Sequence, residues 1–228
     1  MEQPFFYRKK KIFFPFTFFL FSAFFAVLLI SCNSSLTPKP QGYYSISFPK
    51  HQYKLFDQPE YPYSFEYPVY ANVVKDSTFF GETTENPWWI NINFPEFNGR
   101  IYVSYKEIGK NKFDTLIKHA YILTGKHSSK AYSIDDSLIN TTNKIHGMFF
   151  SVGGDVATSN QFYLTDTTRH FLRGALYFDA TPNADSLGIV NQFLLEDMKH
   201  LINTFKWRNW FLYKWTVSLA LAAGMLLS

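Results

Sequence analysis

The chain has 228 residues, a fifth of them aromatic, and a formal net charge of +4 at pH 7. The positive charge lies at the two ends, because residues 33–207 carry 16 basic and 17 acidic side chains, a net of −1. This balance argues against binding to nucleic acid or to acidic lipid. The only cysteine is Cys32, so no disulfide within the chain and no pair of thiolates for a metal is possible.

The N-terminal residues have the pattern of a bacterial lipoprotein signal. A basic cluster, Arg8 to Lys11, precedes an apolar run, Ile12 to Ile30, and the small residue Ser31 stands before Cys32. We expect residues 1–31 to be a signal peptide and Cys32 to carry covalent lipid, the only attached group expected. Each buried methylene contributes about 0.8 kcal/mol, so two or three acyl chains give a stable membrane anchor. The alternative is an uncleaved transmembrane helix, because the run is close to the roughly 20 residues that span a bilayer.

Residues 32–42 are polar and proline-bearing, which predicts an extended tether between lipid and domain. Tyr43–Phe48 alternates aromatic and polar residues and is predicted to be a strand. The segment Lys54–Pro68 is interrupted by prolines and is predicted to be irregular or an edge segment. Val69–Lys75 returns to strand character, and residues 76–87 form a polar loop.

Two strong strands follow, Trp88–Phe94 and Arg100–Lys106. The dipeptide Asn98-Gly99 between them readily adopts positive φ, so an antiparallel hairpin is predicted. A helix should then begin with Asn111 as its cap and end near Gly125, because apolar residues recur at helical spacing between them.

The remaining pattern predicts an antiparallel meander and a second helix. The expected strands are Tyr132–Ile139, Lys144–Val152, Val156–Leu164 and His170–Phe178, and the helix covers about 185–205. With no βαβ alternation, the fold class is α+β: an antiparallel sheet that two helices cover or flank. This element order resembles the Mog1/PsbP-like sandwich.

We therefore expect a single domain at residues 43–207. Residues 208–228 form a separate apolar tail, in which Trp215–Leu227 is too short to span a bilayer. The tail has three interpretations: an interfacial helix, a hydrophobic flap on the domain, or non-native readthrough.

Four side chains are candidates for binding: Arg169, Arg173, Trp88 and Trp89. On a strand, Arg169 and Arg173 would share one face and could grip a carboxylate or phosphate. The alternative is a solvated face with one arginine paired to a helix acid such as Glu196. Adjacent strand residues point to opposite faces, so one tryptophan should be in the core and the other exposed.

No pattern typical of catalysis is present. The six histidines are scattered without the spacing of a zinc site, and Asp135 and Asp136 should point to opposite faces of their strand. Ser47 and Lys50 fit the spacing S-x-x-K by chance, at a strand end without the accompanying motifs. We expect no metal, no catalytic residue and no enzyme activity.

Several segments match a known family. The signal ends in the lipobox Leu29–Cys32 (LISC). It is followed by Thr37–Tyr43 (TPKPQGY), Tyr61–Pro68 (YPYSFEYP), Trp89–Ile92 (WINI), Phe94-Pro95, His170–Phe178 (HFLRGALYF) and Pro182–Leu187 (PNADSL). Together they closely resemble the gliding-motility lipoprotein GldD family. The apolar tail beyond Trp207 departs from the family pattern.

The resemblance implies a lipid-anchored accessory of bacterial gliding and of the associated type IX secretion system. It implies binding to other envelope proteins of these systems, with the domain facing the periplasm, and it supplies no catalytic residues. The sequence leaves open whether the inner or the outer membrane holds the anchor. The competing interpretation is an envelope glycan- or peptide-binding module, or a hydrolase, that uses the Arg/Trp cluster.

Overall fold

The computed structural model describes residues 46–79 and 82–208. The signal peptide, Cys32, the tether and the tail beyond residue 208 lie outside the described residues. Two units divide the chain, Met1–Ile46 and Ser47–Ser228, and every described helix and strand belongs to the second.

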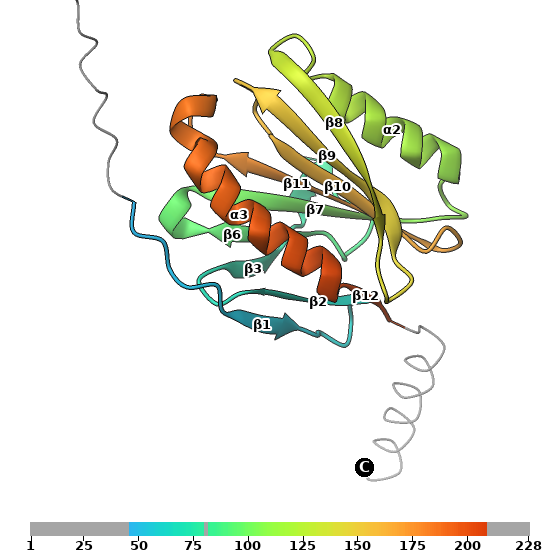
Figure 1. Cartoon of the computed structure of the whole chain (residues 1–228). Helices are drawn as coiled ribbons and strands as arrows, with labels where there is room; N and C mark the ends of the chain where they lie inside the picture. The colour runs from blue at the N-terminus through green and yellow to red at the C-terminus, as the bar shows by residue number, and fades with distance from the viewer. Residues whose placement is uncertain (1–45, 80–81, 209–228) are drawn as a thin grey trace, which may run out of the picture. The chain divides into compact units, whose positions relative to one another are not determined.

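The second unit is built on a seven-stranded antiparallel sheet with the order β3-β6-β7-β11-β10-β9-β8 (Figure 1). Its strands are β3 (Asn72–Lys75), β6 (Ile90–Phe94), β7 (Gly99–Glu107), β8 (Ala131–Asn140), β9 (His146–Gly154), β10 (Asn160–Thr165) and β11 (His170–Phe178). The predicted meander is confirmed, because β8, β9, β10 and β11 are consecutive antiparallel neighbours.

The predicted hairpin of β6 and β7 is also confirmed. A short 3-10 helix, η1 (Pro95–Phe97), connects the strands, and Asn98 follows it with a φ of 47°. Asparagine tolerates this left-handed conformation better than most residues, which places the turn at the predicted dipeptide.

A second sheet of three strands has the order β1-β2-β12, with β1 (Tyr53–Phe56), β2 (Tyr63–Pro68) and β12 (Lys206–Trp207). The prediction that Lys54–Pro68 is irregular or an edge segment was therefore wrong for β2, which is the central strand, whereas β1 is an edge strand. Pro59 and Pro62 lie in the connection between the strands and Pro68 is the last residue of β2, so none of them interrupts the pairing. A minimal hairpin, β4 (Thr78–Phe79) with β5 (Glu82–Thr83), occupies part of the expected polar loop.

The strand predicted at Tyr43–Phe48 is wrong for residues 46–48, which have no regular structure. Phe48 instead stacks on Phe193 with a ring separation of 4.4 Å. The strand predicted from Val69 begins only at Asn72, because residues 69 and 70 form a turn.

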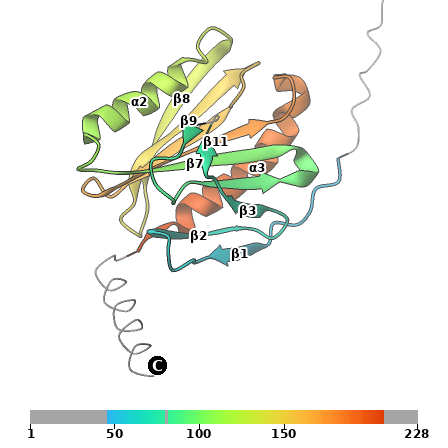
Figure 2. The same cartoon turned by 180° about the vertical axis from the view of Figure 1, so that it is seen from behind.

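Two helices flank the large sheet on opposite faces, α2 (Phe113–Gly125) and α3 (Ala184–Thr204) (Figures 1 and 2). The main core lies on the α3 side, and a smaller cluster lies under α2. Successive side chains of β11 point to opposite faces of the sheet, so the strand contributes to both cores. Phe171 packs in the α2 cluster and Leu172 packs in the α3 core. The α+β class is thereby confirmed. Within the described residues no helix combines the length and apolarity needed to cross a membrane.

Asn111 does not cap α2 as predicted. The capping position is Lys112, which makes no side-chain capping bond, while the Asn111 amide donates to Glu85 at 2.8 Å. The start of α3 does have a side-chain cap, because Asn183 accepts from the Ser186 backbone N–H at 2.9 Å.

A buried carboxylate on α3 connects the helix to the beginning of the described chain. Asp197 is 2% exposed, and its oxygens accept from the hydroxyls of Tyr53, at 3.1 Å, and Tyr70. Its Oδ1 also lies 2.8 Å from His51 Nδ1. Three groups from before β1, from β1 and from the β2–β3 turn thus converge on one residue of α3.

Candidate functional site

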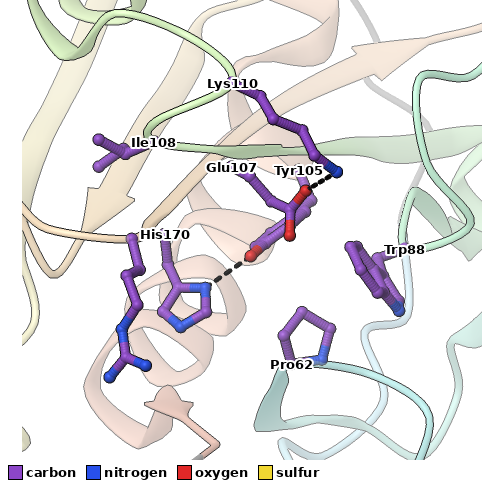
Figure 3. A pocket seen from close by; sticks show the side chains of 8 residues that line it. Pro62, Trp88, Tyr105, Glu107, Ile108, Lys110 and His170 are labelled. Atoms are coloured by element: carbon purple, nitrogen blue, oxygen red, sulfur yellow. Dashed lines mark hydrogen bonds and ion pairs between the residues drawn. The ribbon is translucent and has the colours of Figure 1, made fainter. Parts of the chain in front are cut away.

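A cavity of about 270 Å³ lies beside the end of β7 and the start of β11 (Figure 3). Both strands contribute to it, and the connections before β2, before β6 and after β7 complete it. Its lining residues are Pro62, Trp88, Tyr105, Glu107, Ile108, Lys110, Arg169 and His170.

The polar centre of this cavity is a hydrogen bond between Tyr105 and His170, with 2.5 Å between the hydroxyl oxygen and Nδ1. The strand register brings them together, because His170 pairs with Glu107, two residues beyond Tyr105 on β7. Trp207 of β12 stacks on the imidazole at 4.9 Å, which fixes the plane of the ring.

Burial lowers the pKa of His170, and nearby Arg169 lowers it further against the opposing charge of Asp166. The imidazole is therefore neutral at pH 7, and one of the two groups, the Tyr105 hydroxyl or the ring N–H at Nδ1, donates to the other. The Nε2 atom then lies 4.0 Å from Asp166 Oδ2.

Asp166 organises the turn that leads into β11. Its Oδ1 accepts the backbone N–H groups of Thr168, Arg169 and His170 at 3.0, 2.8 and 2.8 Å. Burial alone would raise the pKa of this carboxyl, but the three backbone donors outweigh it and hold the pKa below its usual range. The carboxylate is thus ionised and fixes the backbone that carries Arg169.

The rim of the cavity combines aromatic and charged groups. The Trp88 ring meets Tyr105 edge to face at 5.3 Å, and its indole N–H donates to the Glu60 carbonyl at 2.8 Å. Lys110 and Glu107 also line the cavity and form an ion pair with each other (Figure 3). The arrangement offers a flat aromatic wall beside charged donors and acceptors, which suits a ligand with both apolar and polar parts.

The same geometry does not favour nucleophilic chemistry. Burial, followed by the charges of Glu107 and Asp166, raises the pKa of Tyr105, so its hydroxyl stays protonated near neutral pH. No cluster of three or more His, Cys, Asp or Glu side chains suited to a metal occurs in residues 46–79 and 82–208. Near neutral pH the Tyr105 hydroxyl therefore acts as a hydrogen-bonding group and not as a phenolate nucleophile.

The four candidate residues from the sequence divide between two cavities. Trp88 and Arg169 line the one just described, whereas Trp89 and Arg173 line a second cavity under α2. The prediction that both arginines share one strand face was wrong, because Arg169 lies in the turn before β11. The pairing with Glu196 was also wrong: Glu196 contacts Lys199 at 3.3 Å, and Arg173 donates to Gln161.

The expectation for the two tryptophans holds only in part. Trp89 is buried, but Trp88 is half-buried and not exposed, and both precede β6, so strand alternation does not separate them. Sequence reasoning missed Tyr105, Asp166 and the role of His170. The partnership of Tyr105 with His170 depends on the register of two strands far apart in sequence, for which the chain carries no local signal.

Comparison with known proteins gives one strong result. The family model described as "Gliding motility lipoprotein GldD" matches residues 33–207, more than three quarters of the chain. No curated protein matches the sequence.

Among solved structures, the chain is similar to cyanobacterial PsbP (CyanoP) from Synechocystis sp. PCC 6803. The identity is 10%, the TM-score is 0.42, and the alignment covers 75% of this chain and 100% of that chain. At this level of likeness the α+β assignment rests on the elements of the chain itself. The family match, which starts directly after Cys32 and ends at β12, shows that the chain belongs to the gliding motility lipoprotein GldD family.

Proposed function

We propose that this protein is a lipid-anchored, periplasm-facing accessory of gliding motility and type IX secretion that works by binding partner proteins. The observation that carries the proposal is the family match over residues 33–207. The signal-like N-terminus and Cys32 supply the anchor.

The edge of the large sheet is the surface best suited to a protein partner. β8 is ten residues long and, within the described residues, pairs with β9 alone. Its outer edge therefore presents backbone donors and acceptors to which a partner strand can add. Tyr132 and Leu138 are 82% and 84% exposed, which provides apolar contacts beside the open edge.

The charges on β8 indicate the kind of strand that fits. Asp135 and Asp136 lie in the middle of the strand, opposite Ser151 and Phe150 of β9. Two adjacent carboxylates repel an acidic partner and attract a basic one. We therefore expect the partner segment to be extended and to carry Lys or Arg near its centre.

The first experiment tests the role in the cell. Deletion of the gene should abolish colony spreading and the release of secreted proteins, and the wild-type gene should restore both. The variant Cys32→Ala should leave the membrane fraction and fail to restore spreading. Normal motility and secretion in the deletion strain would refute the proposal.

The second experiment tests the binding surface. Leu138→Lys in the full chain should reduce the recovery of crosslinked envelope partners and colony spreading together. Leu55→Lys is the matched control, because Leu55 is 62% exposed on β1, which belongs to the three-stranded sheet. Equal partner recovery from both variants would count against β8 as the contact.

A second candidate function is an envelope glycan- or peptide-binding module, or a hydrolase, at the cavity of Trp88 and Arg169. The aromatic wall beside charged groups is the observation in its favour. Purified peptidoglycan fragments would then bind to the wild type and lose affinity in Trp88→Ala and Arg169→Gln. Full motility of those two variants together with lost fragment binding would separate this activity from partner binding.

A further inference from the structure

The second cavity lies between α2 and the sheet and has a volume of about 360 Å³. This falls within the range of about 300–1,000 Å³ typical of small-molecule pockets. Its lining residues are Trp89, Ser104, Lys106, Leu116, His119, Ala120, Leu123, Lys126, His127, Phe171, Arg173 and Tyr177.

Arg173 is the central polar group of this cavity. It is half-buried on β11, and burial lowers its pKa, although a guanidinium stays charged at any physiological pH. Its polar contacts are with Gln161 and Tyr177, both neutral. Across residues 46–79 and 82–208 no carboxylate forms an ion pair with it, so the half-buried charge has no counterion.

The side-chain amide of Gln161, which accepts from Arg173, has an unsatisfied hydrogen-bond donor. Gln161 is fully buried, and its Oε1 accepts from both Arg173 and Thr124. Its Nε2 has no hydrogen-bond partner among the described atoms. Gln161 lies behind the cavity wall, so Arg173, a cation without a counterion, is the group of this pair that faces a further acceptor in the cavity.

The other charged side chains at the cavity have the same sign as Arg173. The basic residues that line the cavity besides Arg173 are Lys106, Lys126, His119 and His127. No acidic residue is among the lining residues. Lys106 is neutralised by its ion pair with Glu85, and burial and the charge of Arg173 lower the pKa of His127. The positive charge at neutral pH therefore comes chiefly from Arg173 and Lys126, partly offset by the carbonyl groups at the end of α2.

Apolar side chains form the rest of the wall. Leu116, Ala120 and Leu123 come from one side of α2, and Trp89 and Phe171 come from the sheet. A bare inorganic anion would leave this surface without a contact, whereas an anion with a hydrocarbon group would cover it.

We propose that the α2 cavity binds a small anion that carries an apolar group, an aliphatic or aromatic carboxylate or phosphate monoester. The anionic oxygens pair with the Arg173 guanidinium, which suits bidentate contact with either group. Lys126 attracts the ligand from the exposed end of α2, and the hydrocarbon part packs against Leu116, Leu123 and Phe171. This activity is independent of partner binding at β8.

The test uses the full chain in detergent with four probes: sodium hexanoate, hexyl phosphate, hexanol and inorganic phosphate. Isothermal titration gives each affinity after subtraction of the same titration into protein-free micelles. Hexanoate or hexyl phosphate should bind at least tenfold more tightly than hexanol and inorganic phosphate. The tighter of the two identifies the anionic group.

Variants then locate the site. Arg173→Gln should weaken binding of the tighter probe at least tenfold, whereas Arg169→Gln, at the other cavity, should leave it unchanged. Lys126→Glu provides a second variant at an exposed position, so the proposal stays testable if Arg173→Gln fails to fold. Equal binding of hexanol, equal binding of inorganic phosphate, no binding of any probe, or unchanged affinity in Lys126→Glu would overturn the proposal.

Discussion

The hydrogen bond between Tyr105 and His170 gives the sharpest quantitative prediction. Tyr105→Phe removes only the hydroxyl, which lies 2.5 Å from His170 Nδ1 in a site where Tyr105 is 1% exposed. No methylene is lost, so the cavity contribution is small. The buried Nδ1 atom loses its hydrogen-bond partner, which lowers the free energy of unfolding by about 1–3 kcal/mol. For a domain of this size the melting temperature should fall by about 2–4 °C per kcal/mol.

Urea unfolding followed by circular dichroism measures the change. Tyr121→Phe is the control, because its hydroxyl contacts Asp136 at 3.4 Å on the surface and its loss should cost less than about 0.5 kcal/mol. A double-mutant cycle with His170→Gln isolates the coupling between the two side chains. If the free energy of unfolding of Tyr105→Phe lies within about 0.5 kcal/mol of the wild-type value, the hydrogen bond does not stabilise the fold. A coupling energy of zero between Tyr105 and His170 would show the same.

Three further predictions concern stability. Because burial lowers the pKa of His170 and of His127, the unfolded chain binds protons that the folded chain does not once the pH falls below about 6.5. Urea midpoints should therefore decline from pH 7.5 to pH 5.5, and a flat profile would contradict the burial of these rings. Asp197→Asn should lower the free energy of unfolding by about 1.5–3 kcal/mol, because it weakens three hydrogen bonds to a buried carboxylate. Glu196→Gln, on the exposed face beside it, should lower the free energy of unfolding far less. Leu194→Ala should lower the free energy of unfolding by about 2–5 kcal/mol, because Leu194 is fully buried in the α3 core. A smaller loss would indicate that neighbouring side chains move into the space that the leucine leaves.

Elements whose pattern is local could be predicted from the sequence. The strand His170–Phe178 was predicted at its observed bounds because its alternating residues serve two different faces, and the second helix was placed to within a residue at each end. The meander also followed from short turns between successive strands, since neighbours in sequence are there neighbours in the sheet.

The failures have a common cause. The three-stranded sheet depends on Ser64 pairing with Lys206, from opposite ends of the folded chain, and the prolines around β2 concealed its strand character. The predicted candidate site was wrong for a similar reason. Arg169 and Arg173 are close in sequence, but they line two different cavities, which depend on the arrangement of the whole sheet. Only the fold shows that His170 meets Tyr105 and that Arg173 meets Gln161.

The carboxylate of Asp197 has a mechanical consequence. Tension that enters the folded unit along the chain from its N-terminal side reaches Phe48 and His51 before it reaches β1. Both are held on α3, one by the stack on Phe193 and the other by Asp197. The C-terminal end of α3 leads into β12, which pairs with β2. A load applied at a lipid tether would thus be shared between the helix and the small sheet, and β1 would not have to bear it by unzipping from its neighbour.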